Sequence, residues 1–105
     1  MADGFVHLHC HSEYSMLDGA ARLKDLVKSC EQMGMPALAV TDHGNLFGAY
    51  EWYRAAKGSA VKPIIGLEAY LTPKTHRSER KRVQFGDGTG DDVASKGAYT
   101  HMTMW

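Results

Sequence analysis

Ala37-Leu38-Ala39-Val40-Thr41 is a short apolar run between Pro36 and the polar turn Asp42-His43-Gly44-Asn45, and this stretch decides the fold of the chain. Pro36 ends any helix that precedes it, because proline cannot continue one. A short apolar run of this kind is typical of a strand that is buried on both faces in a parallel sheet. We therefore expect a buried strand over Ala37–Thr41 that ends in a polar turn.

Helices are expected on both sides of this strand. Residues Ala21–Met33 carry apolar side chains at helical spacing, and Gly34 provides a C-terminal stop. A second helix is expected over Leu46–Lys57. Three large side chains lie near one face of that second helix, namely Phe47, Tyr50 and Tyr53.

Two further apolar runs complete an alternating pattern. Gly4–Cys10 is bounded by glycine and charge, and it predicts a buried strand. Pro63–Leu71 predicts a third strand. The order strand, helix, strand, helix, strand implies parallel pairing with right-handed crossovers. The expected fold class is therefore α/β.

Composition sets the broad class of protein. The 105 residues allow one domain, and their formal net charge of zero excludes a bulk electrostatic grip on nucleic acid or membrane. Cys10 and Cys30 are too few for a disulfide framework. No apolar run approaches the roughly 20 residues of a membrane span, and no signal peptide pattern is present. We expect a cytoplasmic protein with reduced thiols and no membrane contact.

The last third of the chain differs from the rest. Residues 72–98 are rich in Gly, Asp, Lys and Arg and predict a long loop, which is usually functional or mobile when it lies inside a compact domain. Tyr99–Trp105 resumes an apolar pattern, and we expect a domain that is truncated within this strand. The loop's basic residues either contact DNA phosphates or form a solvated tip, and they are Lys74, His76, Arg77, Arg80, Lys81 and Arg82.

Three histidines alternate along the first expected strand. His7, His9 and His11 would share one face of a regular strand, with neighbours roughly 6.6 Å apart. A single buried histidine is more often a hydrogen-bonded core residue than a ligand. Burying three such rings is costly without partners, so this spacing favours a metal site. Cys10 would point to the other face, into the core.

Other candidate ligands follow the expected strands. His43 comes directly after the second strand, Glu68 lies near the end of the third, and His101 opens a fourth. The carboxyl ends of parallel strands face one pocket, so these groups can converge with the paired histidines. Asp18 either reaches the same pocket or caps the next helix. Mixed histidine and carboxylate ligands suit Zn²⁺, Mn²⁺ or Fe²⁺, and this number of ligands favours two or three ions.

Four ordered segments carry a family resemblance. They are H-L-H-C-H-S-E-Y-S-M-L-D-G at 7–19, T-D-H-G-N-L-F-G-A-Y-E-W-Y at 41–53, K-P-I-I-G-L-E-A-Y at 62–70 and Y-T-H-M-T-M at 99–104. Together they resemble the PHP (polymerase and histidinol phosphatase) family. Within it, they are most similar to the amino-terminal PHP domains of the alpha subunits of bacterial replicative DNA polymerase III.

The resemblance implies a fold and a ligand set. The fold would be the amino-terminal part, residues 1–105, of a distorted (βα)₇ barrel with up to three metals at the carboxyl ends of its strands. His7 and Asp42 would orient ligands rather than bind metal. Asp18, Glu68 and His43 would be catalytic, with Glu68 bridging two metals. The metal ligands carried over by motif are His9, His11, Asp18, His43, Glu68 and His101.

The resemblance also implies a function in DNA replication, as part of a DNA-directed DNA polymerase, a nucleotidyltransferase. The PHP domain itself would be a metal-dependent 3′-5′ exonuclease that removes mispaired nucleotides. One alternative is a non-catalytic domain in which the metals stabilise the fold that supports the polymerase. A second alternative is a phosphoesterase of the histidinol phosphatase type. Expected partners are primer-template DNA, the sliding clamp and the clamp loader, and we expect the 105 residues alone to be inactive.

Overall fold

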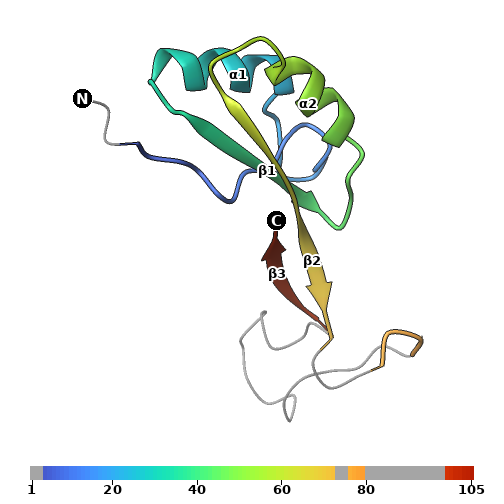
Figure 1. Ribbon diagram of the computed structural model, residues 1–105. Coiled ribbons are helices and arrows are strands. Elements are labelled where there is room, and N and C mark those ends of the chain that lie inside the picture. Colours follow the sequence, from blue (N-terminus) through green and yellow to red (C-terminus); the bar gives the residue numbers. More distant parts are fainter. Residues whose placement is uncertain (1–3, 73–75, 80–98) are drawn as a thin grey trace. The chain divides into compact units, whose positions relative to one another are not determined.

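The computed structural model describes residues 4–72, 76–79 and 99–105. The chain divides into two compact units, the first formed by Met1–Ala69 with Thr103–Trp105 and the second by Tyr70–Met102. Helices and strands alternate from α1 to β2, and β3 is the last element near the carboxyl end (Figure 1). The elements are α1 (Leu23–Gln32), β1 (Ala37–His43), α2 (Ala49–Ala56), β2 (Lys62–Leu71) and β3 (Thr100–Met104).

The three strands form one sheet in the order β1-β2-β3. β1 and β2 are parallel, and their register places Ala37 opposite Lys62 and His43 opposite Glu68. The connection between them passes through α2, as a parallel pair requires a crossover. The predicted strands at Ala37–Thr41 and Pro63–Leu71 and their parallel pairing are therefore confirmed, and the fold is a mixed α/β arrangement. The full barrel remains a prediction.

The predicted strand at Gly4–Cys10 is wrong as a continuous strand. Its only bridge within the described residues joins His7 to Leu38, in parallel orientation. The Ala39 N–H donates to the His7 carbonyl at 2.9 Å, but the next bond runs from the Thr41 N–H to the Cys10 carbonyl at 2.7 Å. Three steps on this segment therefore match two steps on β1. One extra residue interrupts the ladder and turns the side chains out of strict alternation.

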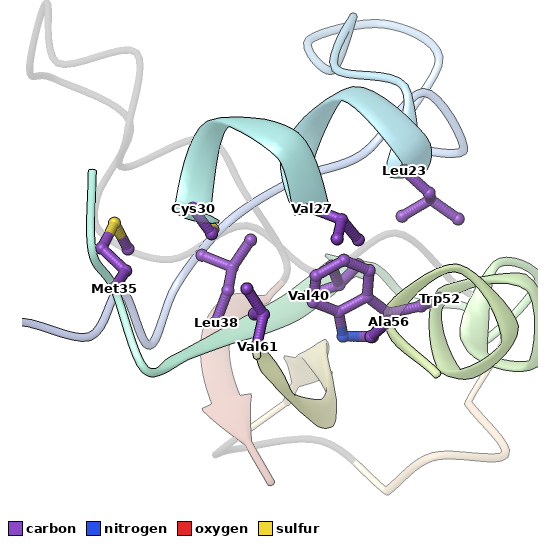
Figure 2. Packing of buried hydrophobic residues seen from close by; sticks show 9 residues of the cluster. All are labelled: Leu23, Val27, Cys30, Met35, Leu38, Val40, Trp52, Ala56 and Val61. Atoms are coloured by element: carbon purple, nitrogen blue, oxygen red, sulfur yellow. The ribbon is translucent and has the colours of Figure 1, made fainter. Parts of the chain in front are cut away.

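The two helices lie together on one side of β1 and cover the apolar core (Figures 1 and 2). Trp52 of α2 is fully buried, and its indole N–H donates to the Ile64 carbonyl at 3.3 Å. This bond satisfies the one polar group of a large apolar side chain. Figure 2 shows how the core side chains face one another from both helices and β1, and they are Leu23, Val27, Cys30, Met35, Leu38, Val40, Trp52, Ala56 and Val61.

α1 begins and ends close to its predicted bounds. It starts after Arg22, which makes no side-chain cap, and its last turn closes through the Gly34 N–H, which donates to the Glu31 carbonyl at 3.1 Å. Gly34 has a φ of 67°, a conformation that favours glycine. The predicted C-terminal stop at Gly34 is therefore confirmed.

α2 begins three residues later than predicted, at Ala49 rather than Leu46. The Asn45 side-chain oxygen accepts the Phe47 N–H at 3.1 Å, and this local turn competes with a helical first turn. The buried side chains of α2 are Trp52 and Ala56. The three aromatic side chains expected near one face are all exposed, namely Phe47, Tyr50 and Tyr53.

The second unit is described only in part. Tyr70, Tyr99 and His101 form a small ring cluster, with Tyr99 and His101 stacked at a centroid distance of 5.7 Å. His76 and Arg77 are exposed, within the described residues 76–79. The other expected basic residues lie outside the described part of the chain, and they are Lys74, Arg80, Lys81 and Arg82. Neither described helix is long and apolar enough to span a membrane.

Candidate metal centre

The centre is built on Glu68, close to the end of β2. Its side chain is buried, with a residue exposure of 5%. The parallel register brings His43 directly opposite, and the Gly44 N–H donates to the Glu68 carbonyl at 2.9 Å. Gly44 has a φ of 58°, so the chain turns away immediately after His43. The ends of β1 and β2 are thereby tied together with two candidate ligands side by side.

Three histidine rings surround one oxygen of Glu68. His9 Nε2 lies 2.7 Å from Glu68 Oε2, and His11 Nε2 is in direct contact with the same oxygen. His43 Nδ1 lies 3.6 Å from it. His9 and His11 both reach this oxygen from a segment that bonds to β1 through the carbonyls of His7 and Cys10. A single buried carboxylate oxygen is thus shared by side chains from two separate segments.

Asp18 joins the same group of side chains from the loop 12–19. Its Oδ2 lies 2.6 Å from His43 Nε2 and 3.5 Å from His11 Nδ1. The rings of His11 and His43 are in contact, with centroids 4.1 Å apart. The alternative in which Asp18 caps α1 is wrong, because the N-cap is Arg22. Half of the Asp18 side chain is exposed, at 51%, so it lies on the solvent side of the cluster.

These side chains fit a metal centre by their chemistry and spacing. Two groups share His11, the first with His9 and Glu68 and the second with Asp18 and His43. In each group the candidate ligand atoms lie within 4.8 Å of one another. Imidazole nitrogens with carboxylate oxygens suit Zn²⁺, Mn²⁺ or Fe²⁺. The two groups overlap at His11, so together they form one continuous cluster of candidate ligands.

Two predicted histidines do not belong to these groups. His7 packs edge-on against the Phe5 ring, with centroids 4.8 Å apart, and its carbonyl holds β1. His101 belongs to the second unit, where it stacks on Tyr99. Its role as a ligand remains a prediction, and so does the orienting role of His7.

Asp42 faces away from these ligand groups and into the protein. It accepts hydrogen bonds from the Ser12 N–H, the Ser12 hydroxyl and the Ser15 hydroxyl, each at 2.7 Å. All three residues are buried. We call Ser12, Ser15 and Asp42 the serine–aspartate network. Sequence reasoning did not single out the two serines, because a serine in a polar loop carries no signal that distinguishes it from a solvated one.

Cys10 and Cys30 are free thiols on the apolar side of the site. Burial raises the pKa of Cys10, and the nearby Asp42 carboxylate and Cys30 raise it further. Burial also raises the pKa of Cys30. Neither sulfur belongs to a group of candidate ligand atoms within the described residues. Cys10 packs against the hydrophobic core, in agreement with its expected position.

An open depression of about 460 Å³ adjoins the histidines. His9, His11 and Asp18 line its polar side, and Leu26 and Met33 contribute to its apolar side. His9, His11 and Asp18 are therefore accessible from outside the protein, whereas Glu68 lies buried behind them.

The sequence is similar to alpha subunits of DNA polymerase III from several bacteria. DNA polymerase III subunit alpha from Mycobacterium tuberculosis is 52% identical over 102 residues, which cover 95% of this chain and 8% of that protein. The corresponding subunit from Saccharopolyspora erythraea is 52% identical over 111 residues, and that from Thermus aquaticus is 50% identical over 102. Their alignments cover 97% and 95% of this chain but 9% and 8% of those proteins. The chain therefore spans less than a tenth of the length of these relatives.

A solved structure shares the fold. An amidohydrolase from Chromobacterium violaceum, solved with bound sulfate and no metal, aligns with a TM-score of 0.56 and 27% identity. The alignment covers 68% of this chain and 24% of that protein. The PHP domain family matches residues 7–104, a range that includes every candidate ligand described above. This chain belongs to the PHP domain family.

Proposed function

We propose that this chain is part of the alpha subunit of a replicative DNA polymerase and forms a metal-dependent 3′-5′ exonuclease site there. The observation that carries the proposal is the gathering of three histidines around one buried Glu68 oxygen, with Asp18 on the solvent side. The similarity to DNA polymerase III subunit alpha supports a role in DNA replication. A phosphodiester at a primer 3′ end is the substrate class that fits both a metal centre of this kind and a role in DNA replication.

The candidate ligands would have different roles according to their burial. His9, His11, Asp18, His43 and Glu68 would together hold the divalent ions. When bound, such ions lower the pKa of a coordinated water and offset negative charge on a phosphate ester. Glu68 is buried and fixes the histidines, whereas Asp18 is half exposed and can orient a group that arrives from solvent. His101 would add a further ligand from β3.

DNA would reach this site through the parent protein. We infer that Arg77, Arg80, Lys81 and Arg82 contact phosphates, since paired positive charges provide the sequence-independent part of DNA binding. The sliding clamp and clamp loader are the partners that a replicative polymerase implies, and the cytoplasm is its place in a bacterial cell.

The test uses the full-length natural protein that carries this sequence, as wild type and with Asp18→Asn. A primer with a mismatched, labelled 3′ nucleotide is incubated with Mn²⁺ or Zn²⁺, and nucleotide release is followed. We expect release by the wild type and its loss in Asp18→Asn, with polymerisation retained. Asp25→Asn is the matched control, because Asp25 is an exposed aspartate in the first turn of α1.

The outcomes separate the candidate functions. Full proofreading by Asp18→Asn would overturn the role of Asp18. No release by either protein would overturn the exonuclease. Phosphate release from small monoesters, without nucleotide release from DNA, would favour a phosphatase instead.

A metal centre that only stabilises the fold is the second candidate function. The burial of Glu68 favours it, because this carboxylate joins the segment 7–11 to β1 and β2 inside the protein. A bound ion at such a junction contributes folding free energy directly. In this case Glu68→Gln would lower the melting temperature and polymerisation together, and the wild type would release no nucleotides.

A further inference from the structure

The loop 12–19 is attached to the end of β1 through the serine–aspartate network. Asp42 is 3% exposed, and Ser12 and Ser15 are 0% and 4% exposed. A buried carboxylate is costly unless hydrogen bonds replace its water shell. The two serines donate the three hydrogen bonds that Asp42 accepts. These bonds fix the loop 12–19 against the end of β1.

The two serine hydroxyls make nearly equivalent contacts. The Ser12 hydroxyl donates to Asp42 Oδ2 and the Ser15 hydroxyl donates to Asp42 Oδ1, both at 2.7 Å. Each hydroxyl also accepts one backbone N–H. Ser12 accepts that of Tyr14 at 3.2 Å, and Ser15 accepts that of His43 at 3.1 Å. The loss of either hydroxyl should therefore cost a similar amount of folding free energy.

The two serines differ in what else depends on them. The carbonyl of Ser15 accepts the N–H groups of Asp18 and Gly19, at 3.0 and 2.6 Å. Ser15 therefore holds the backbones of both Asp18 and His43, whose side chains meet at 2.6 Å. The Ser12 hydroxyl bonds neither of these backbones in the described contacts.

The loop is closed tightly beside Asp18. A Cβ atom on Gly19 would lie 2.0 Å from the Ser12 carbonyl oxygen, a separation that no side chain tolerates. The chain after Asp18 therefore has little freedom to adjust if Ser15 loses its contacts. Small displacements of the Ser15 backbone would pass directly to Asp18.

We propose that Ser15 is a positioning residue that sets the distance between Asp18 and His43 for metal binding. This inference rests on the proposed metal centre. Groups that orient metal ligands typically change metal affinity by about 10-fold to 100-fold when they are removed. Ser15 bonds the backbones of Asp18 and His43, two members of the group that also contains His11. In the described contacts it bonds neither His9 nor Glu68, which form the other group with His11.

The test compares Ser15→Ala with Ser12→Ala in the full-length natural protein. Co²⁺ alone is titrated into the metal-free protein, and its visible absorption reports the ligand geometry. Asp18→Asn identifies the Co²⁺ signal that belongs to the group with Asp18. We expect Ser15→Ala to raise the Kd for that ion by about 10-fold and to shift its absorption. Ser12→Ala should lower the melting temperature by a similar amount and leave this Kd within about 2-fold of wild type, because it contacts neither ligand.

Each outcome decides the inference. Equal Kd changes in the two variants, or no change in Ser15→Ala, would overturn the positioning role while the metal centre stands. A wild type that binds no Co²⁺ at this group would overturn the metal centre and, with it, the role of Ser15. If Ser15→Ala does not fold, Ser15→Cys and Ser12→Cys replace the pair, since each keeps a weak donor of similar size. The same difference in Kd is then expected with a smaller magnitude.

Discussion

The two halves of β1 are buried to a similar degree but among different partners. Leu38 and Val40 are 2% and 5% exposed and pack against α1 and α2. Thr41 and Asp42 are 0% and 3% exposed, and hydrogen bonds surround them. The Thr41 hydroxyl accepts the Cys10 N–H at 3.0 Å, and Asp42 accepts bonds from the two serines.

One strand therefore contributes both to the stability of the fold and to the placement of particular side chains. Apolar packing has no preferred direction, so the first half of β1 stabilises the fold and tolerates substitutions of similar volume. Hydrogen bonds depend on distance and angle, so the second half fixes where particular atoms lie. His43 follows this polar half directly, and Ser15 bonds its N–H. The candidate metal centre thus begins where packing gives way to directional contacts.

The largest expected effect is at the apolar half. Trp52→Ala should destabilise the first unit by about 3–5 kcal/mol, because it removes a fully buried ring and leaves a cavity beside β1. Hydrogen–deuterium exchange of peptides covering residues 37–43 of the full-length protein measures this change. Tyr53→Ala is the control on the same helix, since Tyr53 is 47% exposed. A Tyr53→Ala effect as large as that of Trp52→Ala would contradict the assignment of the core.

The next effect is at the polar half. Asp42→Asn should cost about 1–3 kcal/mol, because the amide places a donor against the serine hydroxyls and the Ser12 N–H. It should also weaken metal binding by the group with Asp18, whereas Trp52→Ala should act on stability first. Hydrogen–deuterium exchange of the same peptides measures the loss of stability, and a Co²⁺ titration measures the change in metal affinity. If Asp42→Asn changed stability but left metal binding intact, the proposed division between the halves of β1 would fail.

The smallest effect concerns Tyr14, which links the loop 12–19 to α2. Its hydroxyl donates to Glu51 Oε2 at 2.7 Å, and this bond to a carboxylate raises the pKa of Tyr14 above its ordinary value of 10. The protonated phenol is favoured in the folded state, so the bond's contribution is complete below pH 10 and is lost as the pH rises through the folded pKa. Absorbance at the phenolate band against pH should show one late tyrosine that is missing in Tyr14→Phe. A late transition that persists in Tyr14→Phe would assign it to another residue.

Much of the fold could be predicted from local sequence. Pro36 and Gly34 delimit α1 and β1, because proline and glycine have backbone preferences that act within a few residues. The alternation of apolar runs predicted parallel pairing of β1 with β2, since a crossover helix leaves few other topologies. The predicted strand at Gly4–Cys10 was wrong because its extra residue is defined only by its pairing with β1. The local sequence pattern carries no information about that pairing.

The candidate site shows the same limit. Its residue types could be recognised in the sequence. Metal chemistry is indicated by histidines at alternate positions and by Asp18, His43 and Glu68 near strand ends. Only the tertiary structure decided which of them meet. The register of β1 and β2 sets His43 beside Glu68, and the backbone bonds between the segment 7–11 and β1 hold His9 and His11 near the same oxygen.

Side-chain type and local backbone preference are local properties, so the order of helices and strands and the kind of chemistry could be predicted without the structure. The tertiary structure alone decided that Ser12 and Ser15 are buried against Asp42, and that the Asp18 carboxylate faces His43 rather than caps α1. These contacts join residues between 25 and 30 positions apart, and a hydrogen bond over that separation forms only after packing has brought both partners together.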